Sequence, residues 1–126
     1  MIDLERFAVL LDEQVALLPA ALFNRLNLGV SVAEQAKRES RARPGLPVYI
    51  LGEYHRHPVM GRGVVLYYGS FRNVYGHLPE EALRLEIDRV LRHELTHHLE
   101  SMAGDRDLER EDARRLQSWN SGEGEG

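Results

Sequence analysis

One long amphipathic pattern covers residues 79–103 and constrains the fold more than any other segment of the chain. Its apolar residues recur three and four positions apart, which is the spacing of one face of an α-helix. They are Leu83, Ile87, Val90, Leu91, Leu95, Leu99 and Met102. Pro79 suits the first turn of a helix, and Gly104 predicts its end. The sequence therefore predicts one long helix from Pro79 to Gly104.

Shorter elements are predicted on both sides of this helix. In chain order they are helices over residues 3–18 and 19–26, strands over 28–35, 47–54 and 62–71, and a last short helix over 108–117. The charged segment 36–46 ends in Pro44-Gly45 and predicts a loop. This order favours an α+β fold, with a small mixed or antiparallel sheet packed against the long helix and flanked by terminal helices.

Length and composition limit the domain organisation and the class of protein. With 126 residues, the chain fits one domain over residues 1–117, followed by a Gly/Glu-rich tail over 118–126 that we expect to be disordered. The absence of cysteine excludes disulfides and thiolate metal ligands. The 16 basic and 20 acidic residues are mixed along the chain, so no nucleic-acid-binding surface is expected. The acidic, helix-periodic N-terminus predicts neither a targeting segment nor a membrane span, and we expect a cytoplasmic protein.

The long helix carries the pattern His-Glu-x-x-His at residues 93–97. Residues four apart on a helix lie about 40° apart and roughly 6 Å along the axis, so His93 and His97 can bind one metal ion together. Glu94 is turned about 100° from His93 and can instead reach a metal-activated water as its general base. This is the helix signature of zinc metalloproteases. It predicts a Zn²⁺ site in which His93 and His97 are ligands and Glu94 is catalytic.

The surroundings of the motif argue against a histidine-rich solvated helix face. On the helical wheel Glu94 falls within the apolar arc, where a carboxylate is costly unless something pairs with it. His98 also points into this arc. We expect His98 to be a hydrogen-bonded core histidine, and the alternative is that it orients a metal ligand or Glu94.

A catalytic zinc usually takes a third protein ligand, and here several downstream carboxylates are candidates. They are Glu100, Asp105, Asp107, Glu109, Glu111 and Asp112. A chain turn at Gly104 favours Asp105 or Asp107. Both residues are equally suited to capping the last helix, and spacing alone does not separate the two roles.

These residues resemble the small bacterial zincin-like metallopeptidase family, also described as minimal zincins. The resemblance extends over about residues 5–116. It rests on the end of the first helix at Leu17-Leu18-Pro19, on "LGEYHRHP" and "VVLYYGSF" in the middle, on "EIDRVLRHELTHHLE" and on the doubled His97-His98. It implies a zinc-dependent peptidase that acts on a peptide or protein substrate.

The resemblance also implies roles for individual residues. The spacing Gly104-Asp105-Arg106-Asp107 matches the family's third ligand with Asp107, although this chain inserts four residues before Gly104 and Asp105 stays an alternative. The strand over 62–71 is the candidate for an exposed edge that pairs with extended substrate, or else it is an ordinary buried strand. Tyr54 is favoured as the group that stabilises the oxyanion.

Three functions remain open from the sequence. The first is a metal-dependent peptide hydrolase with Glu94 as base. The second is a non-catalytic metal-binding or protein-interaction module on the same fold. The third is a helical partner-binding protein with incidental histidines. A carboxylate at position 94 favours catalysis, because a purely structural metal site has no need of one.

Overall fold

The structure of this chain is a computed structural model that describes the backbone of residues 1–40 and 48–121. Side chains are described up to Arg106 within these ranges, and for Arg114. The elements, in order, are α1 (Leu4–Leu17), the 3-10 helix η1 (Ala20–Phe23), β1 (Gly29–Ala33), β2 (Lys37–Arg38), β3 (Tyr49–Ile50), β4 (Gly52–His57), β5 (Gly61–Tyr67), α2 (Tyr68–Tyr75) and α3 (Glu80–Ser121). The predicted α+β fold is confirmed.

The main sheet has three strands in the order β1-β5-β4. β1 runs parallel to β5, with Val32 opposite Leu66, whereas β4 runs antiparallel to β5, with Tyr54 opposite Val64. β2 and β3 form a separate two-stranded antiparallel ribbon. The sheet is therefore mixed, and β4 is one of its edge strands.

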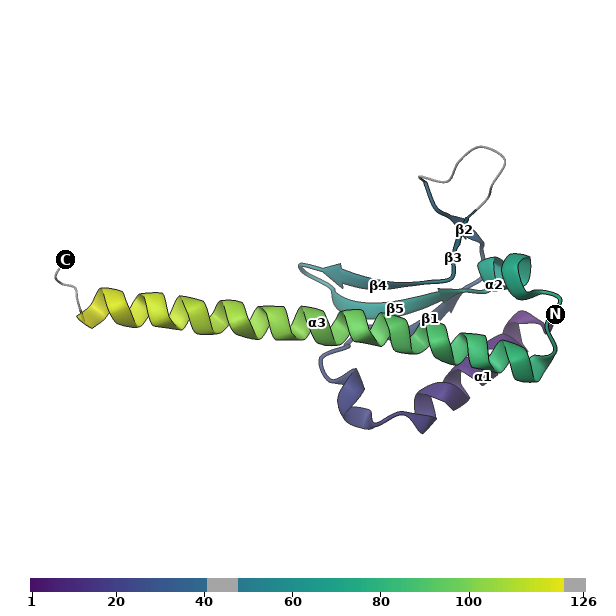
Figure 1. Cartoon of the computed structure of the whole chain (residues 1–126), viewed down its shortest axis with the longest axis horizontal. Coiled ribbons are helices and arrows are strands. Elements are labelled where there is room, and N and C mark those ends of the chain that lie inside the picture. Colours follow the sequence, from purple (N-terminus) through teal and green to yellow (C-terminus); the bar gives the residue numbers. More distant parts are fainter. Residues whose placement is uncertain (41–47, 122–126) are drawn as a thin grey trace.

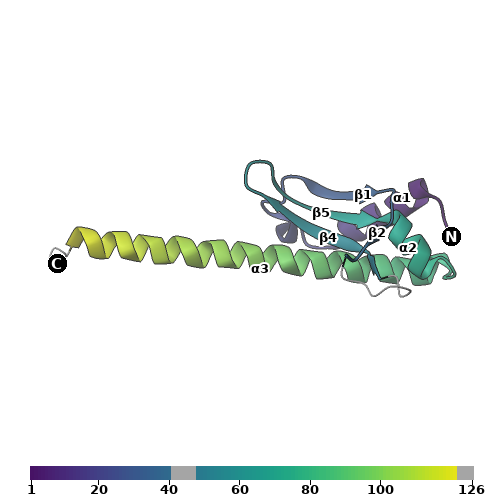
Figure 2. The ribbon, with the colours of Figure 1, turned by 90° about the horizontal axis from the view of Figure 1, so that it is seen from above.

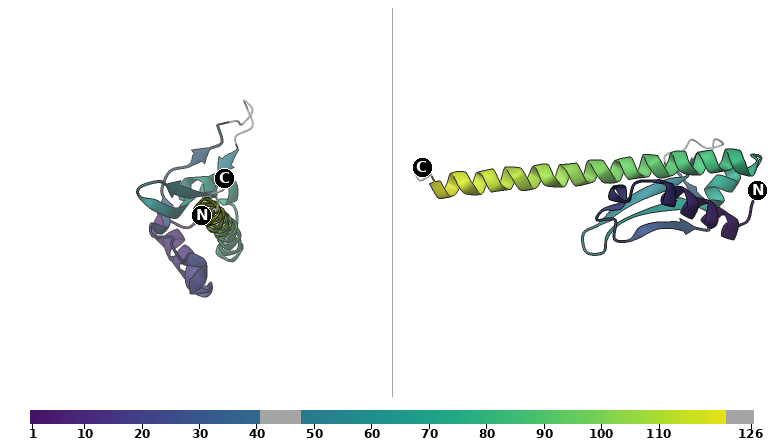
Figure 3. Two further views of the ribbon diagram at one scale, coloured as in Figure 1. Left: turned by 90° about the vertical axis from the view of Figure 1, so that its left-hand side faces the viewer. Right: turned by 90° about the horizontal axis from the view of Figure 1, so that it is seen from below.

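The helices α1 and α3 lie side by side and pack against the sheet, as Figures 1 and 3 show from different directions. Their apolar faces meet the inward side chains of β5 in one core. Its fully buried members are Phe7, Leu10 and Leu11 of α1, Val64 and Leu66 of β5, Phe71 of α2, and Leu83, Ile87 and Leu91 of α3. Because α3 runs along the sheet, residues on its flank face the edge strand β4.

The long helix does not end where the sequence predicts. α3 has 42 residues and continues through Gly104 to Ser121, so the expected end at Gly104 and the separate helix over 108–117 are both wrong. Its C-terminal part extends beyond the sheet (Figure 1, Figure 2). One physical reason is that Asp105 forms ion pairs with Arg56 and Arg62, which fix the helix to the β4–β5 turn beyond the glycine. The predicted tail is helical as far as Ser121, and residues 122–126 lie outside the described residues.

The third predicted strand is also corrected. It ends at Tyr67, and the chain turns at once into α2, where Gly69 packs against the segment before β2. A Cβ added at Gly69 would lie 2.4 Å from the backbone nitrogen of Ala36, so only glycine allows this approach. Of the two roles that the sequence left open for this strand, the structure shows the ordinary buried one: β5 is the central strand, paired on both sides, and is not an exposed edge. The exposed edge beside α3 belongs to β4.

Within the described ranges, no helix combines the length and the apolar character that crossing a membrane requires.

Candidate metal centre

His93 and His97 lie one turn apart on the flank of α3, and their rings face each other. The two Nε2 atoms are 3.2 Å apart, and the ring planes meet at 86°. Zinc–nitrogen bonds of 2.0–2.1 Å at a tetrahedral angle place two ligand nitrogens about 3.3 Å apart. The observed separation therefore matches what a pair of imidazole ligands on one zinc ion requires.

Glu100 lies on the other side of the His97 ring. Its Oε1 atom is 3.4 Å from Nδ1 of His97, one helical turn further along α3. A carboxylate on one ring nitrogen favours the tautomer whose other nitrogen has a free lone pair. A hydrogen on Nδ1 of His97, facing Glu100, would leave Nε2 with a free lone pair on the side of His93.

Glu94 lies next to His93 but on the buried side of α3. Only 7% of this residue is exposed, in contrast to the exposed histidines beside it. Burial raises the pKa of the Glu94 carboxyl, while the imidazoles of His93 and His97 and the backbone N–H of Tyr54 act in the opposite direction. The protein thus holds a carboxyl group with a raised pKa on the buried side of the histidine pair.

Tyr54 and His98 form a hydrogen-bonded chain beneath this site. The Tyr54 hydroxyl lies 2.9 Å from Nδ1 of His98, and Nε2 of His98 lies 2.7 Å from the carbonyl oxygen of Asn24. Because a carbonyl oxygen only accepts, Nε2 of His98 donates to it, and Nδ1 of the neutral ring accepts the Tyr54 proton. His98 is fully buried. The chain of bonds links α3, β4 and the segment after η1.

A small open cleft lies between α3 and the start of β4. Its volume is about 180 Å³, and its lining residues are Tyr49, Ile50, Leu51, Gly52, Arg89, Val90, His93 and Glu94. A Cβ at Gly52 would lie 2.8 Å from Cγ1 of Val90 and 3.5 Å from Cγ of Glu94. A glycine is thus needed where the strand passes this close to the helix, and Gly52 and Val90 both line the cleft.

The downstream carboxylates are placed differently from the histidines. Since α3 is continuous, Asp105 is eight residues beyond His97, or about 12 Å along the axis. Its carboxylate is engaged by Arg56 and Arg62. Asp107 is in the same helix, about 15 Å beyond His97, and its side chain lies outside the described residues. Among described side chains, no group of three His, Asp or Glu residues gathers closely enough to hold a metal ion.

The hydroxyl groups of the two tyrosines at the junction of β5 and α2 are engaged by other partners. The Tyr67 hydroxyl donates to Glu53, and the Tyr68 hydroxyl donates to the carbonyl oxygen of Ile2. Tyr54 is the described tyrosine that adjoins both Glu94 and His98.

Sequence reasoning missed three contributions to this site. Gly52 carried a signal, since a glycine inside a strand pattern often marks a close backbone approach. The sequence predicts Glu100 only as a candidate metal ligand, whereas it contacts Nδ1 of His97. The carbonyl of Asn24 gave no signal, because its contact with His98 joins residues 74 positions apart.

No protein-family model matches the chain, and no curated protein matches it. A solved structure is similar to most of the chain, a "conserved hypothetical protein (TTHA0227)" from Thermo thermophilus. The two chains are 33% identical and superpose with a TM-score of 0.69, over 82% of this chain and 99% of the other. Identity at this level over nearly the whole partner indicates common descent together with a common fold. This chain therefore belongs to the same family as that conserved hypothetical protein.

Proposed function

We propose that this protein is a zinc-dependent peptidase of the zincin type, in which His93 and His97 are two of the metal ligands and Glu94 is the general base. The observation that carries the proposal is the pair of Nε2 atoms 3.2 Å apart, directly beside a buried carboxyl group. A bound zinc ion would polarise the scissile carbonyl and lower the pKa of a water molecule toward about 7.

Glu94 has the properties of a base for this chemistry. The pKa of Glu94 is raised, which brings it closer to the operating pH, and a general base is most effective when its pKa is near that pH. In the proposed reaction Glu94 accepts a proton from the attacking water and then passes it to the leaving amine. Burial of Glu94 also disfavours the charged form of its carboxyl group, so this residue lowers the stability of the protein. A purely structural role does not explain why a carboxyl group stands at this position.

The substrate in this proposal is an extended peptide. β4 is an edge strand, and no described strand pairs with its outer side. A peptide can add to this edge through backbone hydrogen bonds, with its carbonyl group near Glu94 and His93 in the cleft. The proposed substrate binds beside β4 rather than β5, because both edges of β5 are already paired.

Tyr54 serves in this proposal as a positioning residue. Its hydroxyl proton is directed to His98, so it is not free to stabilise an oxyanion. Its backbone N–H faces the Glu94 carboxylate and its side chain is fixed by the buried histidine. Tyr54 thus holds Glu94 in place on the strand side of the cleft.

The second candidate is a non-catalytic metal-binding or protein-interaction module. The absence of a third ligand among the described side chains favours it. The two candidates differ in what they require of Glu94, because a structural site gains nothing from a buried carboxylate beside it.

The test compares wild type with Glu94→Gln on a mixture of unstructured peptides, with cleavage followed by mass spectrometry. The proposal predicts zinc-dependent cleavage by wild type and a loss of about 10²-fold or more in the variant, at unchanged zinc content. The free energy of unfolding of Glu94→Gln should equal or exceed that of wild type. Equal cleavage by both proteins would remove Glu94 from the mechanism. Zinc binding without cleavage by either would favour the non-catalytic module.

A further inference from the structure

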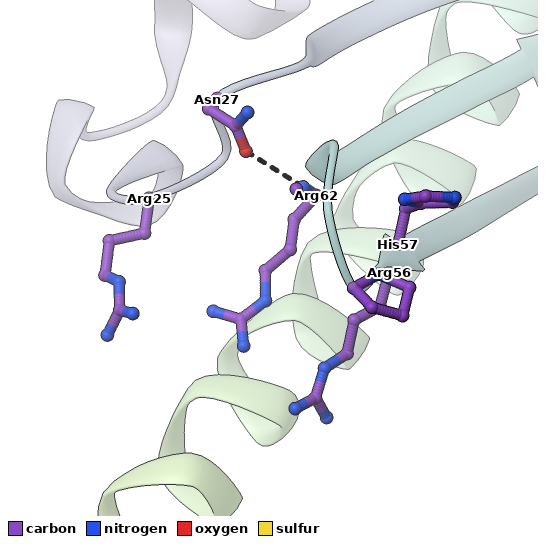
Figure 4. A pocket seen from close by; sticks show the side chains of 7 residues that line it. Arg25, Asn27, Arg56, His57 and Arg62 are labelled. Carbon is purple, nitrogen blue, oxygen red and sulfur yellow. Dashed lines mark hydrogen bonds between the residues drawn. The ribbon is translucent and has the colours of Figure 1, made fainter.

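Three arginine side chains from separate segments converge at the end of the sheet remote from α2. Arg25 follows η1, Arg56 is in β4 and Arg62 is near the start of β5. Figure 4 shows their guanidinium groups extending in the same direction, toward α3. They line a cavity of about 450 Å³, together with Asn27, His57, Pro58 and Gly61. We call this cavity the arginine pocket.

The positive charge of the arginine pocket is only partly balanced. Asp105 of α3 accepts from Nη2 of Arg56 at 2.9 Å and pairs with Arg62 through its second oxygen. No other described carboxylate forms an ion pair with these two guanidinium groups or with that of Arg25. One carboxylate therefore faces three cations, which leaves an excess of two positive charges among the described side chains.

The frame around the arginine pocket is well fixed. The side-chain amide of Asn27 accepts from the backbone N–H of Arg62 at 2.9 Å and donates to the carbonyl oxygen of Met60 at 2.8 Å. Only 11% of the Arg62 side chain is exposed. The guanidinium group of Arg62 is thus already oriented, so a ligand would not bear the entropic cost of ordering it.

The backbone of Arg25 is in an unfavourable conformation. Its φ angle is +63°, and it is the one described residue other than glycine with a positive φ. Glycine or asparagine is the ordinary choice at such a position, and an arginine there is strained. A strained arginine that lines a cationic cavity, and that forms no described ion pair of its own, indicates that its guanidinium group has a use.

We propose that the arginine pocket binds the phosphate group of a soluble phosphomonoester, or inorganic phosphate itself. The guanidinium fork matches the geometry of phosphate oxygens, and the excess of two positive charges among the described side chains complements a phosphate dianion. A volume of about 450 Å³ exceeds that of phosphate alone and leaves room for the group that carries it. Asp105 is twelve residues beyond His93 along α3, or about 18 Å, so this is a separate site from the metal centre.

The test is isothermal titration calorimetry with inorganic phosphate and with O-phosphoserine, against chloride at matched ionic strength. The key variant is Arg25→Gly, which removes the guanidinium group and relieves the backbone strain, so it should fold at least as stably as wild type. The control is Arg72→Gln, which removes an exposed cation of α2 outside the pocket. We expect saturable binding by wild type and by Arg72→Gln, and an affinity weakened about tenfold or more in Arg25→Gly.

Three results would overturn the proposal. The first is the absence of saturable phosphate binding beyond that of chloride. The second is phosphate affinity that is unchanged in Arg25→Gly, or reduced equally in Arg72→Gln, since either places the anion elsewhere. The third is a protein that binds neither inorganic phosphate nor O-phosphoserine but floats together with phosphatidylcholine vesicles that contain phosphatidic acid. The ligand would then be a lipid headgroup.

Discussion

The Nε2 atoms of His93 and His97 face each other at 3.2 Å on the flank of α3, while Glu94 between them in sequence is turned into the protein. A single helix therefore presents two imidazoles to solvent and a carboxyl group to the cleft. This division follows from the helical period, since residue 94 is rotated about 100° from residue 93 and residue 97 is not. The surrounding contacts that support this arrangement can each be tested by substitution.

Tyr54→Phe should destabilise the protein. The change leaves Nδ1 of the buried His98 without its donor, and an unsatisfied buried polar atom costs about 1–3 kcal/mol. Urea unfolding measures the difference. Tyr49→Phe is the matched control, because no described hydrogen bond involves its hydroxyl, and it should change the free energy of unfolding by less than about 0.5 kcal/mol. Equal stabilities of all three proteins would show that the Tyr54–His98 bond contributes nothing.

Gly52→Ala should destabilise the protein by about 1–3 kcal/mol, because the new Cβ would lie 2.8 Å from Cγ1 of Val90. Val90→Ala removes that atom and should recover part of the loss. A double-mutant cycle in urea therefore predicts a favourable coupling of about 0.5 kcal/mol or more. Strictly additive effects would mean that strand and helix do not meet as closely as described.

Gly104→Ala should stabilise the protein by about 0.5–1 kcal/mol. Gly104 is inside α3, and a Cβ there meets nothing within 4 Å, so alanine gains helix propensity without a clash. Thermal unfolding without metal measures the gain, and a loss of stability would contradict a straight helix at this position.

The same variant, Gly104→Ala, also tests the identity of the third metal ligand. If Asp105 or Asp107 binds zinc through a bend at Gly104, the stabilised helix should weaken zinc affinity.

Asp105 should make stability depend on pH in the acid range. A hydrogen bond from Arg62, followed by the charges of Arg56 and Arg62, holds the pKa of Asp105 below its usual range. Its contribution is therefore complete above the ordinary aspartate pKa of about 4 and is lost as the pH falls through the lower folded-state value. The stability difference between wild type and Asp105→Asn should shrink between pH 6 and pH 3. Asp88→Asn, which removes the partly buried partner of Arg92, is the control. A difference that is constant with pH would refute the ion pairs of Asp105.

Local features of this molecule could be predicted from the sequence, and long-range ones could not. The periodic apolar residues identify α1 and most of α3, and the alternating segments identify the main strands. The end of α3 was missed because Gly104 favours a stop locally, whereas Asp105 gains ion pairs with arginines more than 40 residues away. The place of β5 in the sheet, as an exposed edge or as a buried strand, stays open from the sequence because strand order depends on tertiary pairing, which alternation does not encode.

The same distinction applies to the candidate site. The positions of His93, Glu94 and His97 relative to one another follow from helical geometry and could be derived from the sequence. The cleft itself depends on the approach of β4 at Gly52, and the setting of His98 depends on the carbonyl of Asn24. Neither contact produces a periodic pattern in the sequence from which it could be predicted.

The central claim is that His93 and His97 bind zinc together, and zinc content measures it most directly. The proteins are wild type, His97→Ala and the control His77→Ala, which removes an exposed histidine before α3. They are purified without chelator, offered equimolar zinc, desalted and analysed by elemental mass spectrometry. The account predicts about one zinc ion per chain in wild type and in His77→Ala, and little in His97→Ala. A wild type without zinc, or full zinc content in His97→Ala, would contradict it.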